Sequence, residues 1–441
     1  MQTSQVLGLN TATTAPGWDF IFGYQPSYKW LDSIANKGWL STAPSLNYLF
    51  MQSYSENLDM RANFEPLKDF RLDLNLNKTY SKNHSEYFKN TLSVDDPMYE
   101  HLNAVDAGSF TISYSILGTV FEKLSSQEVS ATFKQFEANR EIISQRWQSP
   151  EGNPVYSNDI FFNPLDSTFN PNYAEGYGPY SQDVLIPAFL AAYTGKSAAT
   201  VSLNTFDQIP KPNYRITYNG LSKLPGFKKI FSAFTVTSAY TSTLALNSFV
   251  TDLDFDGNYY AYAHVVDTLT GNFVALYDIP NVLINESLSP LIGIDATWVN
   301  GITSKFDFKK SRTLTMSFID YQLTQIHSTE FTVGMGYKMT GFTFPFKWRG
   351  KRPNLENDLT FKVDFSFRDD ITTNFRLDQD LNEPTGGLTS ISFSPTIDYV
   401  VNDRFNIQLY FDRQKTVPKI STSYPITSTN AGIKVRFSLS E

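Results

Sequence analysis

The stretch from Leu359 to Arg368 constrains the fold more than any other part of the chain. Its sequence, LTFKVDFSFR, places an apolar residue at every odd position and a polar residue at every even position. Successive side chains of a β-strand point to opposite faces, so the stretch predicts a strand with one apolar and one charged face. Two folds contain such strands. In a soluble sandwich the apolar face is core, whereas in an outer-membrane barrel it meets lipid and the polar face lines the lumen.

The same alternation recurs in two long parts of the chain. Residues 57–118 carry it in several short runs, and residues 212–441 carry it up to a last run that contains Ile433, Val435 and Phe437. The 36 Phe and 25 Tyr residues also favour β-structure. We therefore predict an all-β, antiparallel fold with about fifteen to seventeen strands.

The remaining residues interrupt this pattern. Residues 1–56 show no sustained period and predict an irregular segment. Residues 119–211 predict a large insert of helices and long loops. Within the insert, Ser125 and Glu128 form a capping box that is followed by apolar residues at helical spacing, and a second short helix is expected over 181–192.

The lengths of the connections favour the membrane fold over the sandwich. Counted from the Asn300-Gly301 dipeptide, which suits a type I′ hairpin turn, connections at one end of the strands are short and those at the other end are mostly long. Outer-membrane barrels have this asymmetry, with short turns in the periplasm and long loops outside. We therefore predict a transmembrane β-barrel segment whose C-terminus lies at the periplasmic end. The short connections are Asn300–Gly301, residues near His327, Asp369–Asp370 and Asn402–Asp403, and the others are 339–358, 379–387 and 413–427, with Lys309–Arg312 as a short exception.

In a barrel, the polar face of each strand lines the lumen. A wide lumen with Ser, Thr, Asn and charges of both signs lets a hydrated, folded protein pass without adhering. The candidate lumen-lining residues are Lys362, Asp364, Arg368, Arg376, Asp412, Lys434 and Arg436.

No motif in the chain predicts chemistry, so we expect no catalytic, cofactor-binding or metal-binding residue and no enzyme activity. The run Asp252–Gly257 matches the first half of a calcium loop, but Ala263 stands where the last acidic ligand belongs, which favours a polar turn. The 4 His residues are scattered without metal-site spacing. The lack of Cys excludes disulfides and thiolate sites, and the net charge of -8 argues against nucleic-acid binding.

Four longer runs carry a resemblance to a known family. They are Val184–Gly195 (VLIPAFLAAYTG), Asn213–Leu221, Leu288–Asp295 and Pro418–Pro425. Together they resemble the SprA/Sov family, the outer-membrane translocons of the type 9 secretion system, over most of the chain.

The resemblance implies that the chain is the C-terminal part of a longer protein, in agreement with an N-terminus that lacks the pattern of a signal peptide. It implies a pore in the cell outer membrane that exports folded cargo proteins, including adhesins for gliding motility. The implied partners are a shuttle barrel of the PorV kind, a periplasmic plug protein, secreted cargo and outer-membrane lipid. The alternatives are a self-contained porin or ligand-binding barrel, and a soluble secreted β-protein that binds glycans through Tyr and Trp.

Overall fold

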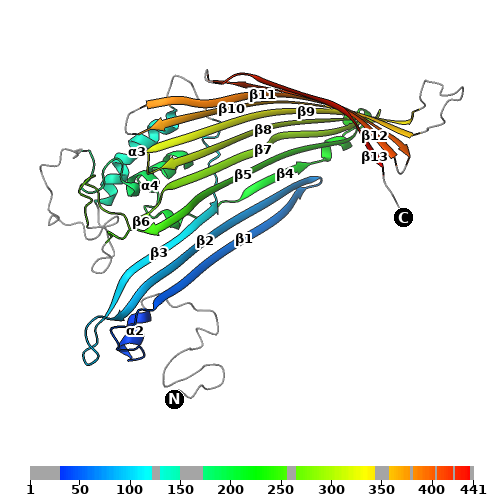
Figure 1. Ribbon diagram of the computed structural model, residues 1–441. Helices are drawn as coiled ribbons and strands as arrows, with labels where there is room; N and C mark the ends of the chain where they lie inside the picture. Colours follow the sequence, from blue (N-terminus) through cyan, green and yellow to red (C-terminus); the bar gives the residue numbers. More distant parts are fainter. Residues whose placement is uncertain are drawn as a thin grey trace, which may run out of the picture.

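The computed structural model describes residues 30–121, 130–148, 172–255, 265–342, 357–377, 381–402, 405–420 and 423–437. Its main element is a 13-stranded antiparallel sheet, drawn in Figure 1 as a broad, curved surface. The prediction of an all-β antiparallel fold is confirmed. The strands are β1 (Leu49–Leu67), β2 (Phe70–Asn90), β3 (Tyr99–Ser113), β4 (Asn213–Tyr218), β5 (Phe231–Thr251), β6 (Tyr277–Asp278), β7 (Asn281–Trp298), β8 (Ile302–Ser317), β9 (Gln322–Phe342), β10 (Asn357–Arg376), β11 (Leu381–Asn402), β12 (Phe405–Pro418) and β13 (Ile426–Phe437).

The strands lie almost in sequence order, from β1 at one edge to β13 at the other. Strands β3 and β4 share one position between β2 and β5: β3 pairs with Lys78–Asn90 of β2, and β4 pairs with Phe70–Asn75. The insert therefore leaves the sheet halfway along a strand position and returns to complete it. It spans residues 114–212, close to the predicted 119–211.

The two ends of the sheet differ. The turn end contains the β1–β2 turn, the β7–β8 turn and the last residues of β13 (Figure 1). The insert end contains the β2–β3 connection, β6 and the insert helices. At the turn end, the β7–β8 turn has three residues, with Gly301 N donating to Trp298 O at 3.0 Å and Gly301 at φ 85°. Neither Val299 nor Asn300 has the positive φ that a type I′ turn requires, so the predicted type I′ turn is wrong in type although right in place.

Three predicted turns are wrong because they lie inside strands. Residues Lys309–Arg312, His327 and Asp369–Asp370 belong to the interiors of β8, β9 and β10, and β11 starts within the predicted 379–387 loop. At these points polar residues occupy positions of the strand face that is otherwise apolar, so the sequence loses its apolar–polar alternation although the backbone stays extended. The strands are therefore longer and fewer than expected.

The N-terminal segment is more regular than predicted. Residues Trp30–Asn36 form helix α2, and β1 starts at Leu49 instead of residue 57. Short 3-10 turns η2 (Thr205–Asp207), η3 (Gly220–Lys223) and η4 (Phe227–Lys229) connect other elements.

The insert contains helices α3 (Ala131–Trp147) and α4 (Gln182–Thr194). The N-cap of α3 is Ser130, whose hydroxyl accepts from Phe133 N at 3.0 Å; the predicted cap, Ser125, lies outside the described residues. None of the described helices is long and apolar enough to cross a bilayer.

Helix α4 is buried on all sides from Val184 to Tyr193 because it lies between α3 and the sheet. Pro187 inside it has no N–H, so the carbonyl of Asp183 lacks its helical donor. Trp147 Nε1 of α3 donates to this carbonyl at 2.9 Å, which both satisfies it and joins the two helices.

Candidate functional site

The cross-strand register assigns each side chain of the sheet to one of two faces. On β10, Phe365 lies opposite Val333 of β9 and Phe393 of β11, while Lys362 lies opposite Gly336 and Thr396. We call these surfaces the Phe365 face and the Lys362 face. Both continue across the sheet because neighbouring strands remain in register apart from local bulges.

The Phe365 face carries mostly apolar side chains in its turn-end half, interrupted by Ser238 and Ser304, and we call this surface the apolar band. Phe361, Val363 and Phe365 are 37%, 40% and 41% exposed, so no second layer of described residues buries them. The band covers 359–367 on β10 and 331–339 on β9, the length of about 9–11 residues that a tilted transmembrane strand needs. Its exposed or half-buried members include Leu58, Met60, Phe64, Leu72, Leu74, Leu76, Tyr214, Ile216, Tyr218, Phe234, Val236, Ile292, Ile294, Phe306, Phe308, Phe331, Val333, Met335, Tyr337, Phe361, Val363, Phe365, Phe367, Ile391, Phe393, Ile397, Ile407, Leu409, Phe411, Ile433, Val435 and Phe437.

The apolar band ends at a line of polar residues, which we call the border. On each long strand, the next side chain of the Phe365 face toward the insert end is charged or hydroxylated. Several of these residues are held in ion pairs, such as Glu56 with Lys78 at 2.9 Å and Asp369 with Lys419 at 2.7 Å. The border consists of Glu56, Lys78, Ser242, Glu286, Lys310, Thr329, Asp369, Thr389, Arg413 and Thr429.

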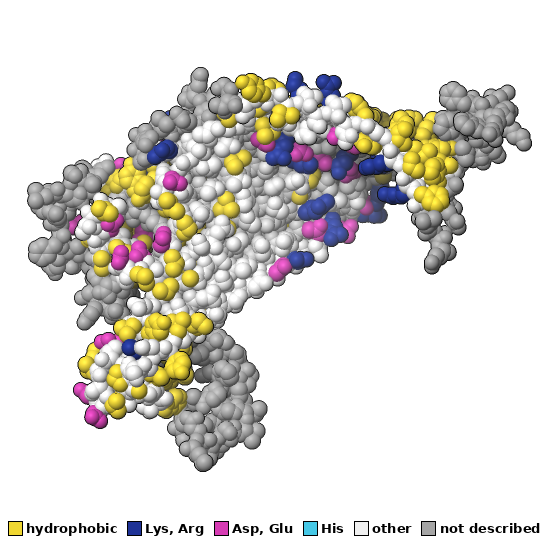
Figure 2. Space-filling model, in the orientation of Figure 1, with side chains coloured by type: hydrophobic (Ala, Val, Ile, Leu, Met, Phe, Trp, Pro, Cys, Tyr) yellow, Lys and Arg dark blue, Asp and Glu magenta, His cyan; other side chains and the backbone are white. Residues whose placement is uncertain are grey.

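The opposite surface, the Lys362 face, is polar along the whole strand length. Charges of both signs are paired on it, with Lys309 Nζ 2.9 Å from Glu330 Oε1 and Lys338 Nζ 2.6 Å from Asp358 Oδ2. Figure 2 shows Lys and Arg side chains interspersed with Asp and Glu over the strands at the upper right, beside a mostly uncharged surface. The register places all the candidate lumen-lining residues on this face: Lys362, Asp364, Arg368, Arg376, Asp412, Lys434 and Arg436.

Beyond the border, the insert covers the middle of the Phe365 face. Phe133 of α3 stacks on Phe375 of β10 with ring centroids 4.7 Å apart, and Phe375 is only 2% exposed. The same core takes in apolar residues of β3, β5, β7, β8 and β9. The helices therefore lie on the same face as the apolar band and leave the Lys362 face uncovered.

A buried charge network joins the first residues of the insert to the sheet. Arg312 Nη2 donates to Glu286 Oε2 at 2.9 Å and to Thr119 Oγ1 at 2.7 Å, and both charged side chains are 0% exposed. Tyr240 Oη donates to Glu286 Oε1 at 2.6 Å and accepts from Ile116 N at 3.0 Å. Since a buried ion pair gains little net stability but a broken one is costly, this network fixes where the insert sits.

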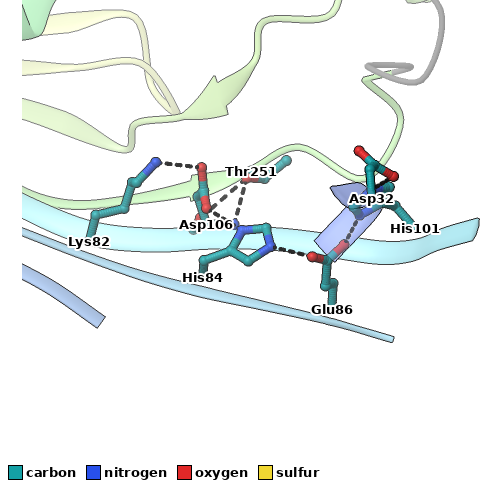
Figure 3. Close-up of polar contacts among 7 residues, drawn as sticks. All are labelled: Asp32, Lys82, His84, Glu86, His101, Asp106 and Thr251. Carbon is teal, nitrogen blue, oxygen red and sulfur yellow. Dashed lines mark hydrogen bonds and ion pairs between the residues drawn. The ribbon is translucent and has the colours of Figure 1, made fainter. Parts of the chain in front are cut away.

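A second polar cluster lies beyond the border on β2 and β3, outside the insert core (Figure 3). His84 lies between Asp106 and Glu86, with Nδ1 2.7 Å from Asp106 Oδ1 and Nε2 3.1 Å from Glu86 Oε1. Hydrogen bonds to Asp106 and Glu86 raise the pKa of His84 to about 9, so the imidazole is a cation at neutral pH. His101 extends the cluster to Asp32 of α2 and so ties the N-terminal helix to the sheet.

No metal centre is built from these groups. Across the described residues, no set of three or more His, Asp or Glu side chains is placed to hold a metal ion. Asp252 and Asp254 of the calcium-like run lie in a turn after β5, where Asp254 N donates to Asp252 Oδ1 at 3.0 Å, whereas Asp256 and Gly257 lie outside the described residues.

Sequence reasoning missed both polar clusters. Glu286 and Arg312 do leave a signal, because each is a charged residue at a position where the parity of its strand calls for an apolar one. The signal that they face each other exists only in the β7–β8 register.

Comparison with known proteins does not assign the chain to a family. No protein-family model matches the sequence, and no curated protein matches it. What the chain does has to be inferred from the two faces of the sheet and from the sequence resemblance.

Proposed function

We propose that the chain forms part of the wall of an outer-membrane β-barrel, with the apolar band in lipid and the Lys362 face toward a water-filled lumen. The observation that carries the proposal is the apolar band itself, which has the length of one transmembrane strand, is exposed or half-buried over most of it, and is bounded by the border. Soluble proteins rarely expose contiguous apolar patches above a few hundred Å². Lipid removes this cost, because the aliphatic and aromatic side chains then lie in hydrocarbon.

The soluble sandwich hypothesis fits the described residues less well. A sandwich needs a second layer over the apolar rows. In the described residues that layer is formed by the insert together with residues 273–279, and the insert stops at the border. The insert covers only the insert-end half of the Phe365 face. This is expected if the turn-end half lies in a membrane and the insert-end half lies in water.

We further propose that this wall belongs to a protein-secretion pore of the SprA/Sov kind that passes folded cargo to the cell surface. The sequence resemblance supports this, and so does a Lys362 face whose charges are mixed and paired, since a single-sign surface would hold oppositely charged cargo. Strands β1 and β13 each pair on one side only within the described residues, which favours a wall completed by further strands over a self-contained porin. The PorV-like shuttle, the plug protein and the cargo remain the proposed partners.

Single cysteines test both parts, because the chain has no Cys of its own. In outer membranes, a membrane-impermeant maleimide is expected to label Lys362→Cys and to leave Phe365→Cys unlabelled. A photocrosslinker at Lys362→Cys is expected to capture cargo during secretion. Equal labelling at both positions would overturn the membrane wall, and correct labelling without any cargo crosslink would leave a porin.

A further inference from the structure

The edge of the insert that meets the border carries an unusual set of side chains. We call residues 114–121, 196 and 209–211 the insert margin. Leu117 and Val120 pack against Tyr240 and Leu288 at the top of the apolar band, so the insert margin lies along the border. Lys211 N donates to Ser113 O at 2.8 Å, just before β4 enters the band.

Three cations gather at this margin. Lys196 and Lys211 both lie over the ring of Tyr114, with Nζ 5.8 Å and 5.5 Å from its centroid, and Lys310 of the border lies 5.2 Å from the ring of Phe121. Burial, and then the neighbouring charge of Lys211, lower the pKa of Lys196.

Carboxylates do not neutralise these cations. Within the described part of the chain, Lys196, Lys211 and Lys310 form no ion pair with Asp or Glu. Glu286 interacts electrostatically with Lys310, but it is already bound by Arg312 and Tyr240.

Apolar side chains flank the cations and are left in the open. Phe121 is 54% exposed and Ile209 is 78% exposed. The outward side of α3, in contrast, exposes mostly polar residues, such as Lys134 and Glu141, with Ile142 as the apolar exception. Exposed apolar and aromatic side chains next to lysines are typical of the interface between hydrocarbon and lipid headgroups, whereas the α3 surface is typical of water.

We propose that the insert margin rests on the membrane surface at the insert end of the sheet and that Lys196, Lys211 and Lys310 bind the phosphates of lipid headgroups. This inference rests on the proposed membrane wall. It places the insert on the outside of the wall, above the lipid, and not in the lumen as a plug. Phosphate matches the site because it supplies the missing negative charge at the height where the apolar band ends.

Lipid selectivity tests the proposal. The whole chain is reconstituted in phosphatidylcholine vesicles with trace spin-labelled phosphatidylglycerol or phosphatidylcholine, and electron paramagnetic resonance measures how much of each label the protein immobilises. We expect roughly threefold preference for the anionic lipid, falling to about onefold when Lys196, Lys211 and Lys310 are all replaced by Gln. Replacing the same three lysines by Arg is expected to retain the preference. This result would show that the Gln variant loses the preference through loss of positive charge and not through misfolding. The matched control, Lys134→Gln with Lys305→Gln and Lys338→Gln, is also expected to retain it.

The outcomes separate the inference from the proposed function. Immobilised lipid of either kind reports contact with the apolar band, so its absence would overturn the membrane wall. Immobilised lipid without selectivity, or equal selectivity in the Gln variant, would overturn the proposed lipid binding by the insert margin and leave the membrane wall standing. Inorganic phosphate at constant ionic strength is expected not to displace the anionic lipid; displacement would identify a free-anion site instead.

Discussion

Phe365 and Phe375 lie on the same strand and the same face, yet their surroundings are opposite. Phe365 is 41% exposed in the apolar band, while Phe375 is 2% exposed beneath Phe133. The border at Asp369 separates them. The comparison teaches that one alternating pattern serves two environments, an outside solvent in one half of the face and the protein's own helices in the other.

The two halves also differ in how they tolerate charge. The turn-end half of the Phe365 face has no charged member in the apolar band, whereas the insert-end half buries Arg312 and Glu286 completely. The protein can bury that pair because Thr119 and Tyr240 add hydrogen bonds to it, which leave only Arg312 Nε of its charged atoms without a partner. Lipid offers no such partners, so a charge in the apolar band has nothing to bind.

The largest expected effect is in the covered half. Arg312→Met leaves Glu286 buried without its cation and is expected to lower the free energy of unfolding by about 3–5 kcal/mol. Adding Glu286→Leu is expected to recover much of the loss, because no buried charge is then left. Denaturant unfolding of the protein in lipid vesicles measures both, and Lys362→Met serves as the exposed control. A loss below about 1 kcal/mol for the single variant would mean that the network does not anchor the insert.

Next comes the exposed half. Phe365→Arg is expected to block assembly into the outer membrane, since a cation in the middle of the band costs about 2–4 kcal/mol in hydrocarbon. Lys362→Ser on the opposite face is expected to assemble normally. Membrane fractionation with protease protection distinguishes them, and equal tolerance of the two changes would show that the faces are assigned wrongly.

The stability contributed by the His84 cluster on β2 and β3, which lies outside both the apolar band and the insert core, is expected to depend on pH. The pKa of His84 is raised from 6.5 to about 9 by Asp106 and Glu86, so its contribution to stability is complete below about pH 6.5 and is lost as the pH rises through 9. Unfolding measured at pH 6.5 and 9.5 should therefore differ by about 1–3 kcal/mol in the native chain, after subtracting the difference seen in His84→Gln. A pH response that His84→Gln leaves unchanged would assign the effect to other groups.

The smallest effect is expected at the turn end. Gly301 has φ 85°, which only glycine adopts freely, so Gly301→Ala should cost about 1 kcal/mol in the β7–β8 turn. Gly118, in ordinary backbone space with nothing near its missing Cβ, is the matched control for the same substitution. If both cost the same, the turn geometry is not as described.

Parts of the site could be predicted because they depend on local periodicity. Lys362, Asp364, Arg368 and Arg376 share one polar face of β10 as expected, since parity within a strand needs no knowledge of its neighbours. That Asp412, Lys434 and Arg436 lie on the same face follows only from the register of β10 to β13. The strand ends could not be predicted the same way. At Lys310 and Asp369 the apolar row turns polar, and a sequence pattern cannot distinguish this change of environment from a turn.

The sequence by itself determined that this chain makes two-faced antiparallel strands, because side chains alternate every two residues whatever covers them. Only the tertiary structure decided what covers each half of the Phe365 face. The insert packs on strands that follow much later in the chain, as far as Phe375 of β10, and the β7–β8 register brings Glu286 to Arg312. Both depend on contacts between residues far apart in sequence, which a local period does not encode.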